Sequence, residues 1–182
     1  RVAAKPGTYF EDRVYGEHEA GGTQVLYLSH VPFEAIGLPT LSPDGKAVAF
    51  GTQDDQGRPA YAICNLPDCS PLRFVPPRPG GGSGRITWTP DSTGFLYVTG
   101  TPQNLWVESL GGKPTRQLTH FTDDRQIADA AWSRDGQQLA FSRGHDIYLA
   151  RWDGSQTHKL VTIPGNCSSL QFSPDGKRLR FS

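Results

Sequence analysis

The sequence predicts an all-β fold built from several small antiparallel sheets, and three observations support this prediction. A tetrapeptide returns four times, with copies that begin 47, 44 and 40 residues apart. Each copy is flanked by β-branched or aromatic runs of four to six residues, which suit strands and are too short for a long helix. Gly and Pro number 21 and 15 and are spread along the chain, as many turns require. The copies are residues 42–45 (SPDG), 89–92 (TPDS), 133–136 (SRDG) and 173–176 (SPDG).

Each repeat follows the same plan of four strands. A short run ends in the tetrapeptide, a second run follows it, and a third run and a more polar fourth run close the unit. A Gly-Gly pair at residues 111–112 and an Asp-Gly pair at residues 153–154 mark a second hairpin, between the third and fourth strands. The expected runs are 85–88 and 129–132 (first strands), 47–50, 95–98, 139–141 and 179–181 (second), 60–63, 104–107 and 146–149 (third), and 115–119 (fourth).

The tetrapeptide has the chemistry of a tight turn. Pro at its second position presets φ, Asp suits the third position, and Gly accepts a positive φ at the exit. In residues 133–136 the Pro is lost but Asp and Gly remain, whereas after residues 89–92 the glycine comes later, as Gly94. The repeated Asp could also be a calcium ligand, but a bond to its own turn backbone explains it without an acidic loop. We therefore interpret the repeated turn as structural.

Units of about 40 residues with four antiparallel strands are typical of the blades of a β-propeller. We expect residues 1–182 to form one propeller domain or propeller segment of about four blade-equivalents. Residues 13–29 match the third and fourth strands of a blade, and the chain stops after the first two strands of another. The two ends could complete one blade and close a four-bladed ring, or both could be cuts through a ring of six or seven blades. The expected blade parts are residues 13–29, 38–75, 85–120, 128–162 and 169–182.

From about Val14 onward the repeats resemble the PD40 repeats of TolB-like propellers, a bacterial relative of the WD40 class. Residues 41–46 (LSPDGK), 131–136 (AWSRDG) and 172–177 (FSPDGK) carry this resemblance. A narrower resemblance is to the propeller tails of multidomain bacterial signalling proteins, where the tail follows a serine/threonine kinase domain or a winged-helix DNA-binding domain. It is carried by residues 64–69, 104–112, 116–122 and 127–132.

Composition argues against several classes of partner. Lys and Arg together equal Asp and Glu at 18 each, so the chain lacks the basic excess of a nucleic-acid surface. The apolar stretches are only four or five residues long, so we expect no membrane contact by this segment. No signal-peptide pattern is present, and the chain has no Met and opens on Arg1. We therefore expect it to be a piece of a larger protein.

Motifs for catalysis and for cofactors are missing from the sequence. No G-x-S-x-G elbow and no H-E-x-x-H motif occurs, and the five His are scattered. The glycine-rich stretch at residues 79–84 is followed by neither a helix pattern nor a Gly-Lys-Ser/Thr sequence, so it predicts a loop and no nucleotide site. We predict no catalytic residue, no metal site and no cofactor in this segment.

Cys64 and Cys69 flank a turn between the expected third and fourth strands. Thiols placed across a hairpin can reach disulfide distance. Two free thiols and a zinc site remain as alternatives, although zinc would need two further ligands and no second Cys or His pair stands nearby. A disulfide would indicate an oxidising compartment. Cys167 is expected to be an unpaired buried thiol.

In a propeller, the loops after the second and the fourth strand open onto the same face. Polar loops on a rigid scaffold are where binding sites usually form, whereas the alternative is an ordinary solvated surface. We therefore take the polar residues of these loops as binding candidates. They are His30, Arg78, His120, Asp123, Asp124, Arg125, Arg143, His145 and Asp146.

The function that follows is recognition. The resemblance implies a non-catalytic sensor or protein-interaction module of a larger bacterial signalling protein, which binds a protein, a peptide or a small ligand and no nucleic acid. Two alternatives are a gating propeller of a serine peptidase of the prolyl oligopeptidase type and a TolB-type periplasmic scaffold protein. We expect the extracytoplasmic, periplasmic side of a membrane-anchored parent, with the cytoplasm as the alternative.

Overall fold

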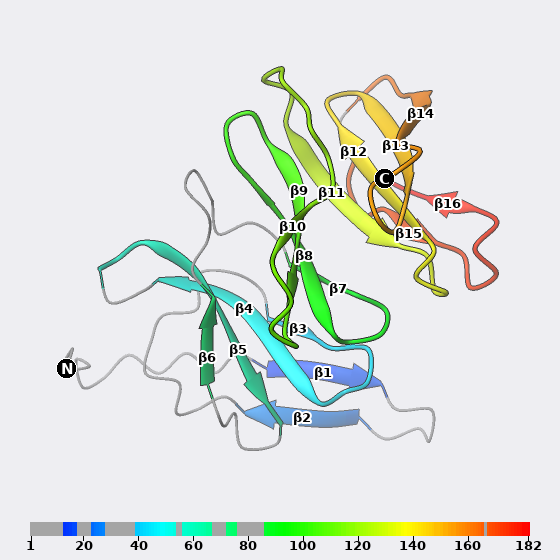
Figure 1. The fold of residues 1–182 in the computed structure, drawn as a ribbon. Helices are drawn as coiled ribbons and strands as arrows, with labels where there is room; N and C mark the ends of the chain where they lie inside the picture. Colours follow the sequence, from blue (N-terminus) through cyan, green and yellow to red (C-terminus); the bar gives the residue numbers. More distant parts are fainter. Residues whose placement is uncertain are drawn as a thin grey trace. The chain divides into compact units, whose positions relative to one another are not determined.

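The computed structural model describes residues 13–17, 23–27, 39–53, 56–66, 72–75, 86–165 and 167–182. Within these residues all regular structure is β, as the sequence predicts. The chain divides into two compact units, of which the first carries strands β1 to β6 and the second carries β7 to β16. Each unit is described by itself. Figure 1 traces both from the N-terminal β1 to the C-terminal β16.

The first unit contains a two-stranded and a four-stranded antiparallel sheet. The hairpin pairs β1 with β2, and in the larger sheet each strand pairs with the next one along the chain. In β4 the small residues at 47, 49 and 51 alternate with Val48, Phe50 and Thr52, and all six are buried. The strands are β1 (Arg13–Glu17), β2 (Thr23–Tyr27), β3 (Thr40–Leu41), β4 (Ala47–Gln53), β5 (Pro59–Asn65) and β6 (Leu72–Val75).

The second unit contains two complete four-stranded sheets and one two-stranded sheet. All three are antiparallel meanders in which consecutive strands pair. The strands are β7 (Thr87–Trp88), β8 (Gly94–Thr99), β9 (Asn104–Ser109), β10 (Arg116–Gln117), β11 (Ile127–Trp132), β12 (Gln138–Arg143), β13 (Asp146–Arg151), β14 (His158–Thr162), β15 (Gln171–Phe172) and β16 (Leu179–Arg180).

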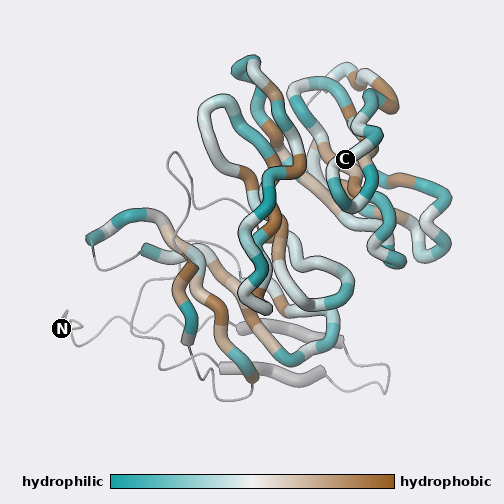
Figure 2. The backbone as a smooth tube through the Cα atoms, viewed as in Figure 1, coloured by the Kyte–Doolittle hydropathy of each residue, from teal (hydrophilic) through white to brown (hydrophobic). Residues whose placement is uncertain are grey.

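The core of the second unit lies between its sheets. Leu96 and Leu105 from the first sheet pack with Leu139 and Phe141 from the next, and each of these side chains is at most 1% exposed. The opposite face of the second sheet contributes Ile147, which packs with Cys167 and Leu170 of the following segment. Figure 2 shows the resulting pattern, with hydrophobic residues along the strands and hydrophilic residues at the turns. Both faces of the β11–β14 sheet are therefore covered.

Buried polar groups also join successive sheets in the second unit. The Asp129 carboxylate on β11 accepts a hydrogen bond from the backbone N–H of Leu170 at 2.8 Å. The Ser142 hydroxyl on β12 accepts from the N–H of Asp129 at 3.1 Å and donates to the carbonyl of Cys167 at 3.2 Å. The first strands β11 and β15 lie beside each other (Figure 1). The β11–β14 sheet is thus joined by buried hydrogen bonds to the segment that follows it.

The repeated tetrapeptide forms the hairpin turn between first and second strands, as predicted. In residues 133–136 the N–H of Gly136 donates to the carbonyl of Ser133 at 2.9 Å, and φ of Gly136 is +69°. The Asp135 carboxylate accepts from the Ser133 hydroxyl at 2.6 Å and from the N–H of Gln137 at 3.0 Å. The carboxylate is thereby used by its own turn, which agrees with the structural interpretation.

The turn at residues 89–92 has Ser92 where the other three copies have glycine. Ser92 itself takes the left-handed conformation, with φ of +59°, so the glycine two residues later does not serve as the exit of the turn. Gly94 instead begins β8, where a Cβ atom would lie 2.2 Å from the carbonyl oxygen of Glu108. The glycine is required by the close approach of β8 to β9.

Ser133 lies at the centre of one turn and provides a test of its energetics. Its hydroxyl is buried, donates to Asp135 and accepts from the N–H of Gln138 at 2.8 Å. We expect Ser133→Ala to lower the free energy of unfolding by about 1–2 kcal/mol in urea denaturation, because the partly buried N–H of Gln138 and the Asp135 carboxylate both lose a partner. In the matched control Ser155→Ala, the hydroxyl makes the same 2.6 Å contact with an Asp but is exposed. Its loss should stay below about 0.5 kcal/mol, and equal losses would contradict the assignment.

Candidate functional site

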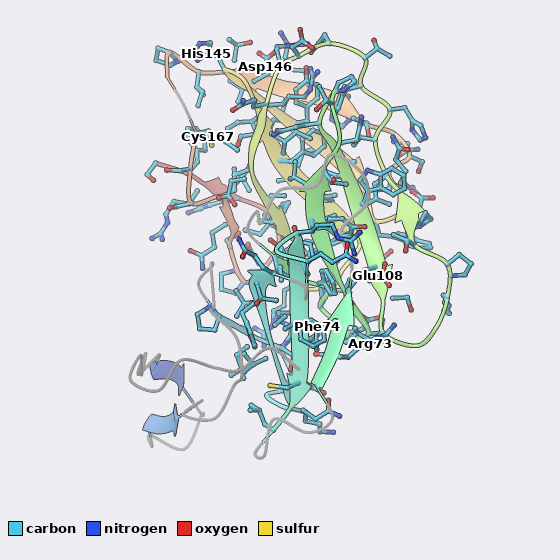
Figure 3. All side chains as sticks on the ribbon, turned by 90° about the vertical axis from the view of Figure 1, so that its left-hand side faces the viewer. Arg73, Phe74, Glu108, His145, Asp146 and Cys167 are labelled. Carbon is cyan, nitrogen blue, oxygen red and sulfur yellow. The ribbon has the colours of Figure 1, made fainter. Side chains whose placement is uncertain are left out.

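The structure brings four of the predicted loop residues together in the second unit. Asp123 and Arg125 come from the segment after β10, Arg143 ends β12, and Asp146 begins β13. His145 and Asp146 lie at the same end of their sheet (Figure 3). His145 is exposed and its Nδ1 lies 3.0 Å from the carbonyl oxygen of Gly165, outside the ion-pair cluster. His120 and Asp124 are exposed beside the cluster, and His30, Arg78 and Cys69 lie outside the described residues.

Asn104 fixes the segment that carries the site. Its side-chain oxygen accepts from the N–H of Phe121 at 2.7 Å and from the Thr119 hydroxyl at 3.0 Å. Its side-chain nitrogen donates to the carbonyls of Phe121 at 3.2 Å and of Pro102 at 3.3 Å. One buried amide therefore uses its oxygen and its nitrogen on the same loop. This holds Phe121 against the neighbouring sheet.

Phe121 and Arg143 form the base of the site. The Phe121 ring meets Phe141 and Tyr148 edge-on, at centroid distances of 5.9 and 5.8 Å. The guanidinium of Arg143 lies over the Phe121 ring, with its central carbon 3.9 Å from the centroid. The Arg143 side chain is 0% exposed. A charge so fully buried needs both an aromatic face and an anionic partner.

Asp123 supplies that partner. Both terminal nitrogens of Arg143 donate to the Asp123 carboxylate, and one of them also donates to the Asp123 carbonyl at 3.3 Å. Arg125 adds a second ion pair to the same carboxylate at 3.1 Å. Hydrogen bonds from Arg125 first, and from Arg143 next, hold the pKa of Asp123 well below its ordinary value of 3.8. The carboxylate is thus ionised while its side chain remains 53% exposed.

Asp146 extends the cluster from β13. It forms an ion pair with Arg125 at 3.0 Å, accepts a hydrogen bond from the Thr162 hydroxyl, and lies 3.6 Å from the Lys159 amino group. The Thr162 hydrogen bond is the main cause that lowers the pKa of Asp146. Sequence reasoning missed Thr162 and Lys159, which lie on the outer strand β14 and carry no motif. It also missed Asn104 and Phe121, which look like ordinary strand and loop residues.

The cluster consists of charged side chains held in place by ion pairs and hydrogen bonds. Within the described residues, no three His, Cys, Asp or Glu side chains gather in a way that could hold a metal ion. None of the described segments forms a helix of the length and apolar character that a membrane crossing requires. The cluster instead presents an ion pair, Arg125 with Asp123, in which both side chains are about half exposed.

The cysteines follow the sequence-based expectations as far as they are described. Cys64 on β5 is disulfide-bonded, whereas Cys167 is free and buried. Burial is the main cause that raises the pKa of the Cys167 thiol, and the charge of Asp129 adds to it. The pairing of Cys64 with Cys69 stays a prediction.

Comparisons with known proteins were made on the sequence and on the fold. No protein-family model matches the chain. It is 25% identical over 146 residues to a TolB homologue of Chlorobium luteolum, which covers 79% of the chain and 22% of that protein. The structure matches TolB from Acinetobacter baumannii with a TM-score of 0.66 at 20% identity, over 88% of this chain and 40% of that one. It matches a prolyl endopeptidase with a TM-score of 0.58 at 25% identity, over 81% and 25%.

Fold and comparisons together define the class of protein. Consecutive four-stranded antiparallel meanders, each with the repeated turn between its first and second strands, are the blades of a β-propeller. More narrowly, the fold is that of a TolB-like β-propeller. The chain spans about a fifth of the length of the curated TolB relative that it matches.

The buried guanidinium of Arg143 should dominate the stability of this end of the second unit. We expect Arg143→Met to lower the free energy of unfolding by about 2–4 kcal/mol, because its hydrogen bonds and its contact with Phe121 are lost together. The matched variant Arg125→Met removes a guanidinium that is 48% exposed and should cost no more than about 1 kcal/mol. Urea denaturation of both variants measures the difference. Similar losses would show that burial of Arg143 is not decisive.

The lowered pKa of Asp123 predicts a contribution to acid sensitivity. The folded state favours the ionised carboxylate, so this contribution is fully present above the ordinary pKa and is lost as the pH falls below it. Between about pH 5 and about pH 2, the free energy of unfolding should fall more steeply in the parent chain than in Asp123→Asn. The neighbouring Asp124→Asn changes an exposed carboxylate without an ion pair among the described residues. That variant should keep the parent slope.

Proposed function

We propose that this propeller segment is a non-catalytic recognition module that binds a protein or peptide at the loop face of its second unit. The observation that carries the proposal is the half-exposed ion pair of Asp123 and Arg125, held from below by buried Arg143 and nearly buried Asp146. An exposed carboxylate and an exposed guanidinium offer an acceptor and several donors at fixed positions. A peptide backbone or a charged side chain can use both.

Rigidity supports this function. Arg125 is fastened at both ends of its guanidinium, to Asp123 and to Asp146. Asp123 is fastened to the backbone as well, because its carboxylate accepts from the N–H of Arg125 at 3.1 Å. Groups held in this way lose little conformational entropy when a partner binds, so a larger part of the contact energy appears as affinity. His120, Asp124 and His145 surround the pair and are exposed.

We further propose that the parent is a larger bacterial signalling protein, with a serine/threonine kinase or a winged-helix regulator next to the propeller. The sequence resemblance over residues 104–122 and 127–132 supports this parent. The disulfide at Cys64 supports an extracytoplasmic location, because disulfides persist in oxidising compartments. A kinase or regulator predicts the matching domain in the flanking sequence, whereas a TolB-type periplasmic scaffold predicts a signal peptide and a helical domain.

The second candidate function is that of a gating propeller in a serine peptidase. The match to a prolyl endopeptidase, over 81% of this chain at 25% identity, favours it. This parent predicts an α/β-hydrolase domain with a G-x-S-x-G elbow in the flanking sequence. Both candidates assign recognition or access to the propeller and place any catalytic residues outside this chain.

Selection from a random phage-displayed peptide library on the immobilised chain tests the recognition function. We expect an enriched peptide whose affinity, measured by fluorescence anisotropy, falls at least tenfold in Arg125→Met, because the outward guanidinium is lost while the fold is retained. The matched control is Lys113→Met, an exposed cation in the turn between β9 and β10. It should change the affinity by less than twofold. Enrichment of no sequence, or equal binding to both variants, would overturn the loop-face proposal.

A further inference from the structure

A second candidate site lies at the other end of the same sheets. A cavity of about 710 Å³ opens where the end of β11 meets β15 and β16. Its wall includes the turns that join first to second strands, at Arg134 and at Pro174. The ion-pair cluster with Asp123 lies beyond the opposite ends of these strands, next to Ile127 and Arg143. The cavity is therefore on the turn face, where the sequence had suggested only structural residues.

The charge of this cavity is of one sign. Arg134, Arg178 and Arg180 line it and are exposed, and no carboxylate side chain belongs to its wall. No ion pair joins these guanidinium groups to a carboxylate within the described residues. The adjacent turn carboxylates are already in use, since Asp135 binds Ser133 and Asp175 binds Ser173 and the N–H of Lys177. In a chain of zero net charge, three unpaired arginines are a local positive field.

The floor of the cavity is apolar. Phe172, Leu170 and Leu179 contribute apolar side chains to the wall, and Trp132, which also lines the cavity, packs in part against the core between the first two sheets. A volume of this size lies within the range of pockets that hold small ligands or a few residues of a peptide. Arginine binds carboxylates through two parallel hydrogen bonds, so three arginines around an apolar floor select for carboxylates that flank an apolar group.

From this charge complementarity, we propose that the turn-face cavity binds an acidic peptide segment, with an apolar side chain against Phe172 and Leu179 and flanking carboxylates on Arg134, Arg178 and Arg180. The occupant is a partner polypeptide. The site is independent of the proposed loop-face function, because the two share no residue and lie at opposite ends of the strands. A propeller with both sites can hold two partners at once.

Direct titration with a defined probe tests the proposal. The probe is a fluorescein-labelled peptide of sequence Gly-Glu-Phe-Glu-Gly, added to the 182-residue chain at low salt. We expect saturable binding that weakens as sodium chloride is raised, because the contacts are between charges. The double variant Arg178→Glu/Arg180→Glu should bind at least tenfold more weakly. The control Lys113→Glu reverses an exposed charge outside the cavity and should change the affinity by less than twofold.

A second readout locates the peptide on the protein. With ¹⁵N-labelled tryptophan, the chain gives indole signals from Trp88, Trp106, Trp132 and Trp152. Trp132→Phe removes and so assigns one of them. The peptide should shift that signal more than the other three, and the unfolding midpoint of each variant checks that it is folded.

Four outcomes would each overturn the proposal. These are the absence of saturable binding, binding that the double reversal leaves intact, and a shift of indole signals other than that of Trp132. The fourth is displacement of the peptide by sulfate at matched ionic strength, which would make the cavity a general anion site. Self-association that the double reversal abolishes, seen by light scattering, would instead assign the cavity to a second copy of this chain. Failure here would leave the loop-face experiment unaffected, since that one depends on Arg125.

Discussion

The guanidinium of Arg143 is a full positive charge with no exposed surface, and the organisation of the loop face follows from its needs. A buried charge is tolerated only with a close anion and with its remaining surface covered. Asp123 provides the anion and Phe121 covers one face of the planar group. Asp123 and Phe121 both belong to the segment after β10. Their contacts with Arg143 therefore hold this segment in place. The amide of Asn104 confines the same segment from the neighbouring blade. The half-exposed side chain of Arg125 then has a defined position, because Asp123 and Asp146, with which it pairs, are themselves held in place.

The two ends of the strands use charge in different ways. At the loop face Asp123 and Asp146 each meet a cation, and the half-exposed pair of Asp123 and Arg125 is the outermost of these ion pairs. At the turn face the carboxylates are consumed by turn hydroxyls and backbone N–H groups, as Asp135 and Asp175 show. The arginines next to those turns keep no partner among the described residues. Because the turn aspartates bind groups of their own turns, they do not neutralise the arginines that line the cavity beside them.

Local sequence chemistry was sufficient to predict the fold. The turn residues set the hairpins, and the short apolar runs between them became strands β4, β8 and β12 with bounds within two or three residues of those expected. The role of Gly94 could not be read from the sequence, because its requirement comes from the carbonyl of Glu108 on the neighbouring strand. The site was only partly predictable. The positions of the loops in a propeller predicted one group that contains Asp123, Arg125, Arg143 and Asp146. No feature of the local sequence distinguishes these residues from Asp124, which is exposed. Asn104 and Thr162 hold the site through hydrogen bonds to segments distant in the sequence, and such contacts leave no sequence motif.

The hydrogen bonds between Asp129, Ser142 and the 167–170 segment have a consequence for how such a chain can be divided. The sequence repeats every four strands, but a blade cut out at those borders would lose the Leu170 N–H that binds the Asp129 carboxylate and the Cys167 carbonyl that binds the Ser142 hydroxyl. The boundaries of the sequence repeat therefore separate residues whose contacts stabilise the fold. A stable fragment has to include the first residues of the following blade, and a propeller of this type can gain or lose blades only together with the segment that caps them.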